Sequence, residues 1–235
     1  MVSRKKSRKE LLKKPDEFIT LTGRLIQFAS VYQKQISYGL CGLVAVALVI
    51  FGYRFFAQRA ETKAFALLEQ TVADYEVNKK ASSISEAYGK ASEELQRLVK
   101  KYGGNAGGKL ARVRYANISY EAGDYHKAIE LYQQSLNDFK DDPLFYHLIL
   151  SGLGYAYQRI EDNRNAAKYF KELSSANDSS LRDEALFNLG LLYEKLGDAA
   201  DSRKAFQEII SNYPNSIYFD IVQEKLSSKG FDSSS

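Results

Sequence analysis

The longest apolar run in the chain lies near its N-terminus and is bounded by two basic residues. Between Lys34 and Arg54 stands QISYGLCGLVAVALVIFGY, nineteen residues without a charge. A helix of that length spans about 28 Å, which is close to the hydrocarbon thickness of a bilayer. The pattern therefore predicts a transmembrane helix at residues 35–54, with Tyr38 and Tyr53 near its two interfaces.

A second apolar pattern precedes this run. After a typical helix start at Pro15, Asp16 and Glu17, apolar residues recur at spacings of three and four: Phe18, Leu21, Leu25, Phe28 and Tyr32. This periodicity indicates an amphipathic helix within a basic cytoplasmic segment, residues 1–34. Our first interpretation places the helix on the inner leaflet, where the basic tail SRKKSRKELLKK meets anionic lipid. A docking helix for a cytoplasmic partner is the alternative.

Two further helical stretches follow the apolar run, at Glu61–Asn78 and Ser83–Tyr102. We interpret residues 55–108 as a helical hairpin that forms a degenerate first repeat. The glycine-rich residues 103–108 then form a flexible joint to the next pair of helices.

Beyond residue 108, three segments repeat the same order of small and aromatic residues. A small residue in a first helix is followed by a turn, a second small residue and an aromatic ring. The matching positions are Ala116, Ala128 and Tyr132, then Gly154, Ala166 and Phe170, then Gly190, Ser202 and Phe206. The turns contain Gly123-Asp124, Glu161-Asp162 and Gly197-Asp198, in which glycine suits a positive φ and aspartate a helix cap.

This order resembles the tetratricopeptide repeat (TPR), a pair of antiparallel helices in about 34 residues. The resemblance implies repeats at 109–142, 147–180 and 183–216, with extra residues around Pro143 and Leu181. It also implies that the small residues let paired helices touch and that the aromatics fill the space between successive pairs. A capping helix from Ser216 to Leu226 and a disordered tail would complete residues 217–235. The fold class we expect is all-α, a TPR-type α-solenoid preceded by a single transmembrane helix.

Charge adds an orientation to this layout. The chain carries 33 Lys and Arg against 29 Asp and Glu, and the excess of basic residues lies in the first 34 residues. Flanking Lys and Arg favour the cytoplasmic side, so we expect a cytoplasmic N-terminus and an extracytoplasmic repeat domain. In a Gram-negative cell this is a single-pass inner-membrane protein with a periplasmic TPR domain.

Composition argues against an enzyme. One Cys and two His leave little material for a metal site or a disulfide framework. The glycine-rich segment before Lys109 approximates a phosphate-binding loop, but Leu110 stands where a hydroxyl residue would hold Mg²⁺. We expect no catalytic residue, no cofactor, no metal, no small-molecule substrate and no nucleic-acid partner.

Binding is the remaining function. On the geometry of the TPR family, the first helix of each pair lines a concave surface, a groove that suits an extended peptide or a partner helix. Its predicted residues are Val113, Asn117, Tyr120, Ser151, Tyr155, Gln158, Arg159, Phe187, Leu191 and Glu194. The alternative is that Tyr120, Tyr155 and Phe187 pack between repeats.

The complete layout is similar to bacterial TPR-like membrane proteins that include the ancillary subunit of the Sec translocon. That similarity implies a non-enzymatic adaptor that binds proteins or peptides, with the translocon or periplasmic chaperones among its partners. The alternative hypothesis is a structural scaffold subunit of an envelope or outer-membrane assembly complex.

Overall fold

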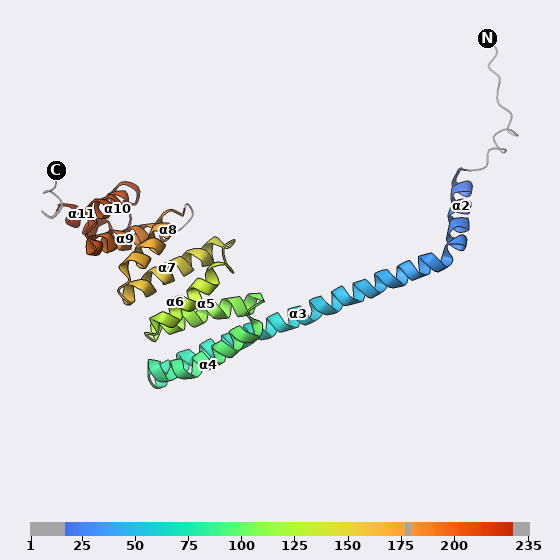
Figure 1. Ribbon diagram of the computed structural model, residues 1–235, viewed down its shortest axis with the longest axis horizontal. Coiled ribbons are helices and arrows are strands. Elements are labelled where there is room, and N and C mark those ends of the chain that lie inside the picture. Colours follow the sequence, from blue (N-terminus) through green and yellow to red (C-terminus); the bar gives the residue numbers. More distant parts are fainter. Residues whose placement is uncertain (1–16, 177–179, 228–235) are drawn as a thin grey trace, which may run out of the picture. The chain divides into compact units, whose positions relative to one another are not determined.

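Every regular element that the computed structural model describes is a helix (Figure 1). The structure describes residues 17–176 and 180–227, with side chains from residue 22 onward. The helices are α2 (Glu17–Val31), α3 (Gln33–Ala81), α4 (Ile84–Tyr102), α5 (Ala106–Glu121), α6 (Tyr125–Leu136), α7 (Pro143–Arg159), α8 (Asn163–Ser174), α9 (Arg182–Leu196), α10 (Ala199–Asn212) and α11 (Phe219–Ser227). Residues up to Gln58 and residues from Arg59 onward form two compact units, which we describe in turn.

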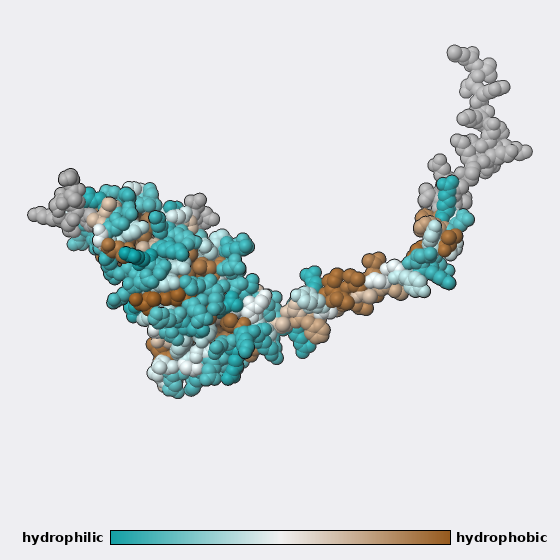
Figure 2. Space-filling view, viewed as in Figure 1, coloured by the Kyte–Doolittle hydropathy of each residue, from teal (hydrophilic) through white to brown (hydrophobic). Residues whose placement is uncertain are grey.

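The first unit contains α2 and the N-terminal part of α3. The helical conformation is interrupted at Tyr32, between α2 and α3. The centre of the Tyr32 ring lies 4.7 Å from the centre of the Phe28 ring. The apolar side chains of α3 point outward here, as Figure 2 shows, and Leu43 and Phe51 are 69% and 70% exposed. This stretch of α3 is long and apolar enough to cross a membrane. The predicted helix start at Pro15 and the side chains of Phe18 and Leu21 lie outside the described residues.

One expectation for this region is wrong. The sequence pattern predicts separate helices at 35–54 and 61–78, whereas the structure has a single helix of 49 residues, α3. The reason is local, because no glycine or proline interrupts the chain between Tyr53 and Ala81.

The second unit is an array in which each helix packs against the next one in the chain, from α4 to α11. The array begins with the C-terminal part of α3, whose buried face holds Ala64, Leu68, Thr71 and Tyr75. The Tyr75 hydroxyl donates a hydrogen bond of 3.0 Å to Glu121 on α5. The pairs α5–α6, α7–α8 and α9–α10 occupy the three predicted repeats. The extra residues at Pro143 lengthen α7 at its start, where Asp142 caps the helix.

Glycines in the first helices allow aromatic rings to pack against their backbones. A Cβ added at Gly154 would lie 2.7 Å from the Phe170 ring, and one at Gly190 would lie 2.4 Å from the Phe206 ring. Both rings are fully buried. The sequence predicts that these aromatics fill the space between successive pairs, but each ring packs against the first helix of its own pair. Tyr132 differs, because its ring packs against Gly152 of the following pair.

The turn within each pair of helices contains one residue in the left-handed backbone conformation, with a positive φ. Gly123 and Gly197 have φ of 86° and 78°, as their glycines predict. Glu161 takes the same place in the second repeat with φ of 62°, although a non-glycine residue there costs about 1–2 kcal/mol. Asp124 and Asp162 then cap the second helices through their carboxylates.

The glycine-rich segment is not a flexible joint throughout. Asn105 caps α5, and Gly107 and Gly108 are buried within its first turn. A Cβ at Gly108 would lie 1.8 Å from the Tyr102 carbonyl oxygen, and one at Gly107 would lie 2.8 Å from Ala64. These glycines therefore allow α5 to approach α3 and α4 closely.

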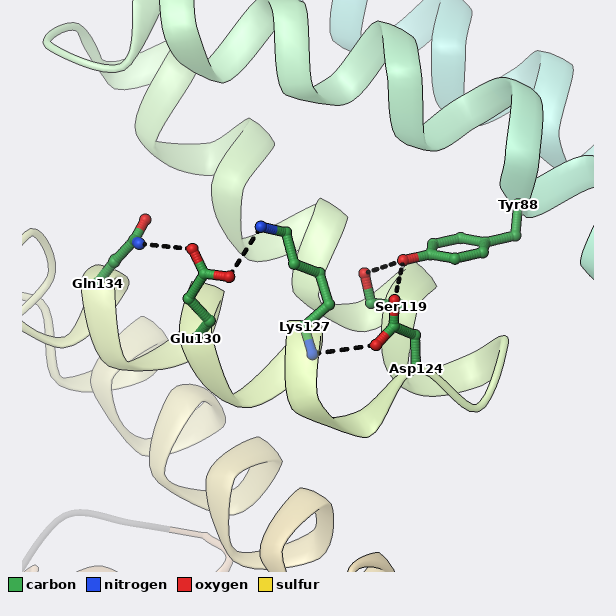
Figure 3. Close-up of polar contacts among 6 residues, drawn as sticks. All are labelled: Tyr88, Ser119, Asp124, Lys127, Glu130 and Gln134. Carbon is green, nitrogen blue, oxygen red and sulfur yellow. Dashed lines mark hydrogen bonds and ion pairs between the residues drawn. The ribbon is translucent and has the colours of Figure 1, made fainter.

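A polar cluster joins α4 to the turn between α5 and α6 (Figure 3). The Tyr88 hydroxyl donates a bond of 2.8 Å to Asp124 and lies 3.3 Å from the Ser119 hydroxyl. The other oxygen of Asp124 accepts from the Lys127 backbone N–H at 3.1 Å. The residue that caps α6 thus also connects the degenerate first pair to the next one.

The C-terminal helix begins later than the sequence predicts. Helix α11 starts at Phe219, whereas we expected Ser216 to cap a helix that began directly after it. Ser216 instead donates a bond of 2.7 Å to Asp183 on α9, and its hydroxyl accepts from the backbone N–H of Tyr218. Val222 of α11 is fully buried. The predicted tail begins at Ser227, but that residue still belongs to α11, and the rest of the predicted tail lies outside the described residues.

We predict that Gly154→Ala lowers the free energy of unfolding by about 1–3 kcal/mol, because its methyl group forces the Phe170 ring to move. The matched control is Gly89→Ala on α4, where nothing lies within 4 Å of the added Cβ. That variant should gain about 0.5–1 kcal/mol from helix propensity. Urea unfolding followed by circular dichroism measures both, and equal changes in the two variants would contradict the packing.

Candidate functional site

Four of the predicted groove residues meet at a cleft between α5 and α7. Asn117 and Tyr120 come from α5, and Ser151 and Tyr155 come from α7. The cleft has a volume of about 280 Å³ and is completed by Tyr132, Leu148 and Gly152. Because Gly152 has no side chain, the Tyr132 ring can pack directly against α7 beneath the cleft.

Asn117 is exposed and its carboxamide is held in one orientation. The buried Tyr132 hydroxyl donates a bond of 2.6 Å to Asn117 Oδ1. Burial raises the pKa of Tyr132, so this phenol remains a donor even at pH values at which an exposed tyrosine loses its proton. The bond leaves both N–H donors of the Asn117 amide available to a ligand in the cleft.

Tyr155 lines the cleft with its ring, while its hydroxyl connects α7 to α9. The hydroxyl donates a bond of 2.5 Å to Glu184 and accepts one of 3.1 Å from Asn188. Burial and then the bond to Glu184 raise the pKa of Tyr155. Its ring also meets that of Phe170 edge-on, with the ring centres 5.2 Å apart. Tyr155 therefore packs between repeats and contributes to the cleft.

Arg159 lies beside a pair of tyrosines that border this surface. Its Nε donates a bond of 2.9 Å to the Tyr125 hydroxyl, and its guanidinium lies 5.2 Å from the centre of the Tyr125 ring. Tyr120 meets Tyr125 edge-on at 5.4 Å. The predicted cation is thus oriented by Tyr125, a residue that the sequence analysis did not select.

The structure does not bring the other predicted residues into the cleft. Val113 is 6% exposed and belongs to the core. Gln158 is half-buried and does not line the cleft. Phe187 stacks on Tyr218 at 4.4 Å, Leu191 packs in the same apolar cluster, and Glu194 pairs with Lys225 of α11 at 3.0 Å. The C-terminal segment of the chain thus contacts the inward positions of the third repeat.

Leu148, which is 47% exposed, adds an apolar side chain to the lining of the cleft. It also lines a neighbouring cleft of about 410 Å³ with Pro143, Leu144, His147 and Leu181. Leu148 lies three residues before Ser151 and seven before Tyr155, so helical spacing alone could have identified it. The two clefts share the Leu148 side chain and therefore lie next to each other along α7.

Within the ranges 17–176 and 180–227, no three His, Cys, Asp or Glu side chains are grouped as a metal site would need. The Glu184 carboxylate accepts the hydrogen bond from the Tyr155 hydroxyl.

Comparison with known protein families identifies repeats in two parts of the chain. A family model described as tetratricopeptide repeat matches residues 85–143, and another with the same description matches residues 184–216. The predicted second repeat, 147–180, lies between these ranges. No sequence among the curated proteins matches the chain.

Solved structures share the fold at low identity. One is a tetratricopeptide repeat protein from Parabacteroides merdae ATCC 43184, with 18% identity and a TM-score of 0.54 over 67% of this chain. This chain covers 58% of that protein's length. Another is BtubC (BKLC) from P. vanneervenii, with 17% identity and a TM-score of 0.53, covering 69% of this chain and 68% of its own.

We predict that Tyr155→Phe lowers the free energy of unfolding by about 0.5–1.5 kcal/mol at pH 7, since it removes the hydroxyl bonds to Glu184 and Asn188. The raised pKa makes the hydroxyl's contribution complete below pH 10, the ordinary value, and it is progressively lost as pH rises above 10. Denaturant unfolding at several pH values tests this. A difference between wild type and variant that stays constant from pH 8 to above 10 contradicts it.

Proposed function

From the tetratricopeptide repeats that the chain carries, we propose that this protein is a membrane-anchored adaptor that binds protein or peptide partners through the cleft between α5 and α7. The observation that supports the proposal is the convergence of Asn117, Tyr120, Ser151 and Tyr155 with the half-exposed Leu148. Oriented amide donors beside aromatic rings and an exposed leucine suit a chain with both a polar backbone and apolar side chains. The function needs no catalytic residue and no cofactor.

Membrane anchoring is part of this proposal. The apolar segment of α3 has the length of a bilayer-spanning helix, and its side chains lie exposed. Lys13, Lys14, Arg24 and Lys34 precede it, against Arg54, Arg59 and Lys63 after it. This bias favours a cytoplasmic N-terminus and an array on the opposite side, which in a Gram-negative cell is the periplasm. Its partners there are the Sec translocon or periplasmic chaperones, as the layout of the chain suggests.

We predict that a C-terminal fusion to a reporter active only outside the cytoplasm gives signal in intact cells. A matched fusion to a reporter active only in the cytoplasm should stay silent at equal expression. The physical reason is the excess of basic residues before α3, which retains that side in the cytoplasm. The reverse pattern of signals would place the array in the cytoplasm and overturn this part of the proposal.

We also predict that a photoreactive residue at Leu148 crosslinks to partner proteins in intact cells. Lys168, exposed on the second helix of the same pair, is the matched control and should give few adducts. Mass spectrometry of the adducts identifies the partners. Adducts with translocon subunits, chaperones or many secreted chains support the adaptor function. Adducts with one stoichiometric envelope subunit would instead support the scaffold function. Equal labelling from both positions contradicts the cleft.

A further inference from the structure

A second cleft, distinct from the one between α5 and α7, lies between α3 and α4. It has a volume of about 310 Å³ and is lined on α3 by Lys63, Leu67, Gln70 and Thr71. On α4 it is lined by Glu94, Arg97, Leu98, Lys101 and Tyr102. No function described above uses this cleft.

The rim of the cleft is basic. Lys63, Arg97 and Lys101 line it, Lys100 lies beside Arg97 on the adjoining surface, and Arg59 lies one helical turn before Lys63. Two carboxylates accompany these five cations. Glu93 pairs with Arg97 at 3.2 Å, and Glu94 accepts a bond of 3.3 Å from Thr71.

Three of these cations have no carboxylate partner. In the described part of the chain, no ion pair involves Lys63, Lys100 or Lys101. Elsewhere in the array several cations are neutralised by close carboxylates, such as Lys79 by Glu121 at 2.7 Å and Lys109 by Asp138 at 3.4 Å. The excess positive charge at this cleft is therefore available to an external anion.

The floor of the cleft is apolar. Leu98 and Tyr102 are almost fully buried, and Leu67 is 38% exposed. The Lys101 ammonium lies 5.4 Å from the centre of the Tyr102 ring, which supports it above this floor. An apolar floor with a cationic rim fits a ligand that combines an anionic group with hydrocarbon.

The position of the cleft in the chain identifies the ligand. Lys63 follows Arg54, the end of the apolar run, by nine residues. Even a fully extended chain of that length reaches only about 30 Å. A lipid surface is thus always within reach of this cleft once α3 is inserted, at a high effective concentration. Long basic side chains close to a membrane bind the phosphates of anionic lipids.

We propose that the cleft between α3 and α4 binds the headgroups of anionic phospholipids in the leaflet on the side of the array. The inference rests on the proposed membrane anchoring. Lys63, Arg97 and Lys101 contact the phosphate, and Leu67 contacts the hydrocarbon next to it.

The test uses the full chain in an uncharged detergent, titrated with phosphatidylglycerol and separately with phosphatidylcholine. Native mass spectrometry counts the lipids bound. The cleft variant is Lys63→Gln/Arg97→Gln/Lys101→Gln, and the matched control is Lys140→Gln/Lys168→Gln/Lys195→Gln, which removes the same charge from exposed positions. Lipid that binds to the membrane anchor itself contributes equally to the cleft variant and to the control. A third variant, Lys63→Arg/Lys101→Arg, keeps the charge.

The expected result is an apparent dissociation constant for phosphatidylglycerol that rises at least about tenfold in the cleft variant. The control and the arginine variant should bind like wild type, and phosphatidylcholine should not distinguish the variants. An equal loss of affinity for phosphatidylglycerol in the cleft variant and the control overturns the proposal. Displacement of the lipid by inorganic phosphate also overturns it. So does crosslinking to an acidic protein, in place of lipid, from a probe at Gln96, which is exposed on α4 next to Arg97.

Failure of the cleft and failure of the anchor give different results. If wild type is extracted from membranes by alkaline carbonate, the proposed anchoring is wrong. If wild type resists extraction but the variants bind phosphatidylglycerol equally, the anchoring stands and the cleft is not a lipid site.

Discussion

The array depends on close contact between an aromatic ring and the bare backbone of a neighbouring helix. Phe170 and Phe206 are each fully buried against a glycine, and Tyr132 packs in the same way on Gly152. A buried ring contributes a large apolar area, and here it reaches the helix backbone because the facing residue has no side chain. These contacts set how closely the helices approach, within a pair for the two phenylalanines and between successive pairs for Tyr132. They therefore influence which side chains of the first helices remain open to solvent.

Most of the fold follows from short-range patterns that the sequence contains. The small and aromatic positions predict the helix pairs, and the turn glycines predict positive φ at Gly123 and Gly197. Two features could not be predicted from those patterns. The continuity of α3 depends on the absence of a helix breaker between two segments with different apolar faces. The burial of Gly107 and Gly108 depends on contacts with other helices. Gly107 packs against Ala64 of α3, and Gly108 packs against Tyr102 at the end of α4.

The candidate site was predicted less completely than the fold. Of the positions that family geometry selects, Asn117, Tyr120, Ser151 and Tyr155 line one cleft. Other selected positions do not line this cleft, because a repeat's inward positions are open only where nothing else packs on them. Val113 lies in the core, and the segment around Tyr218 and Lys225 engages Phe187 and Glu194. The position of that C-terminal segment is a tertiary property that no spacing within the repeats encodes.

Helix α3 has a consequence for the order in which the protein folds. Ribosomes synthesise it before α4 and α5, so its face of Ala64, Leu68, Thr71 and Tyr75 has nothing to pack against at first. The hydrogen-bond acceptor for Tyr75, Glu121, is made 46 residues later. The buried face of α3 therefore gains its full set of contacts only when the chain has been synthesised to the end of α5.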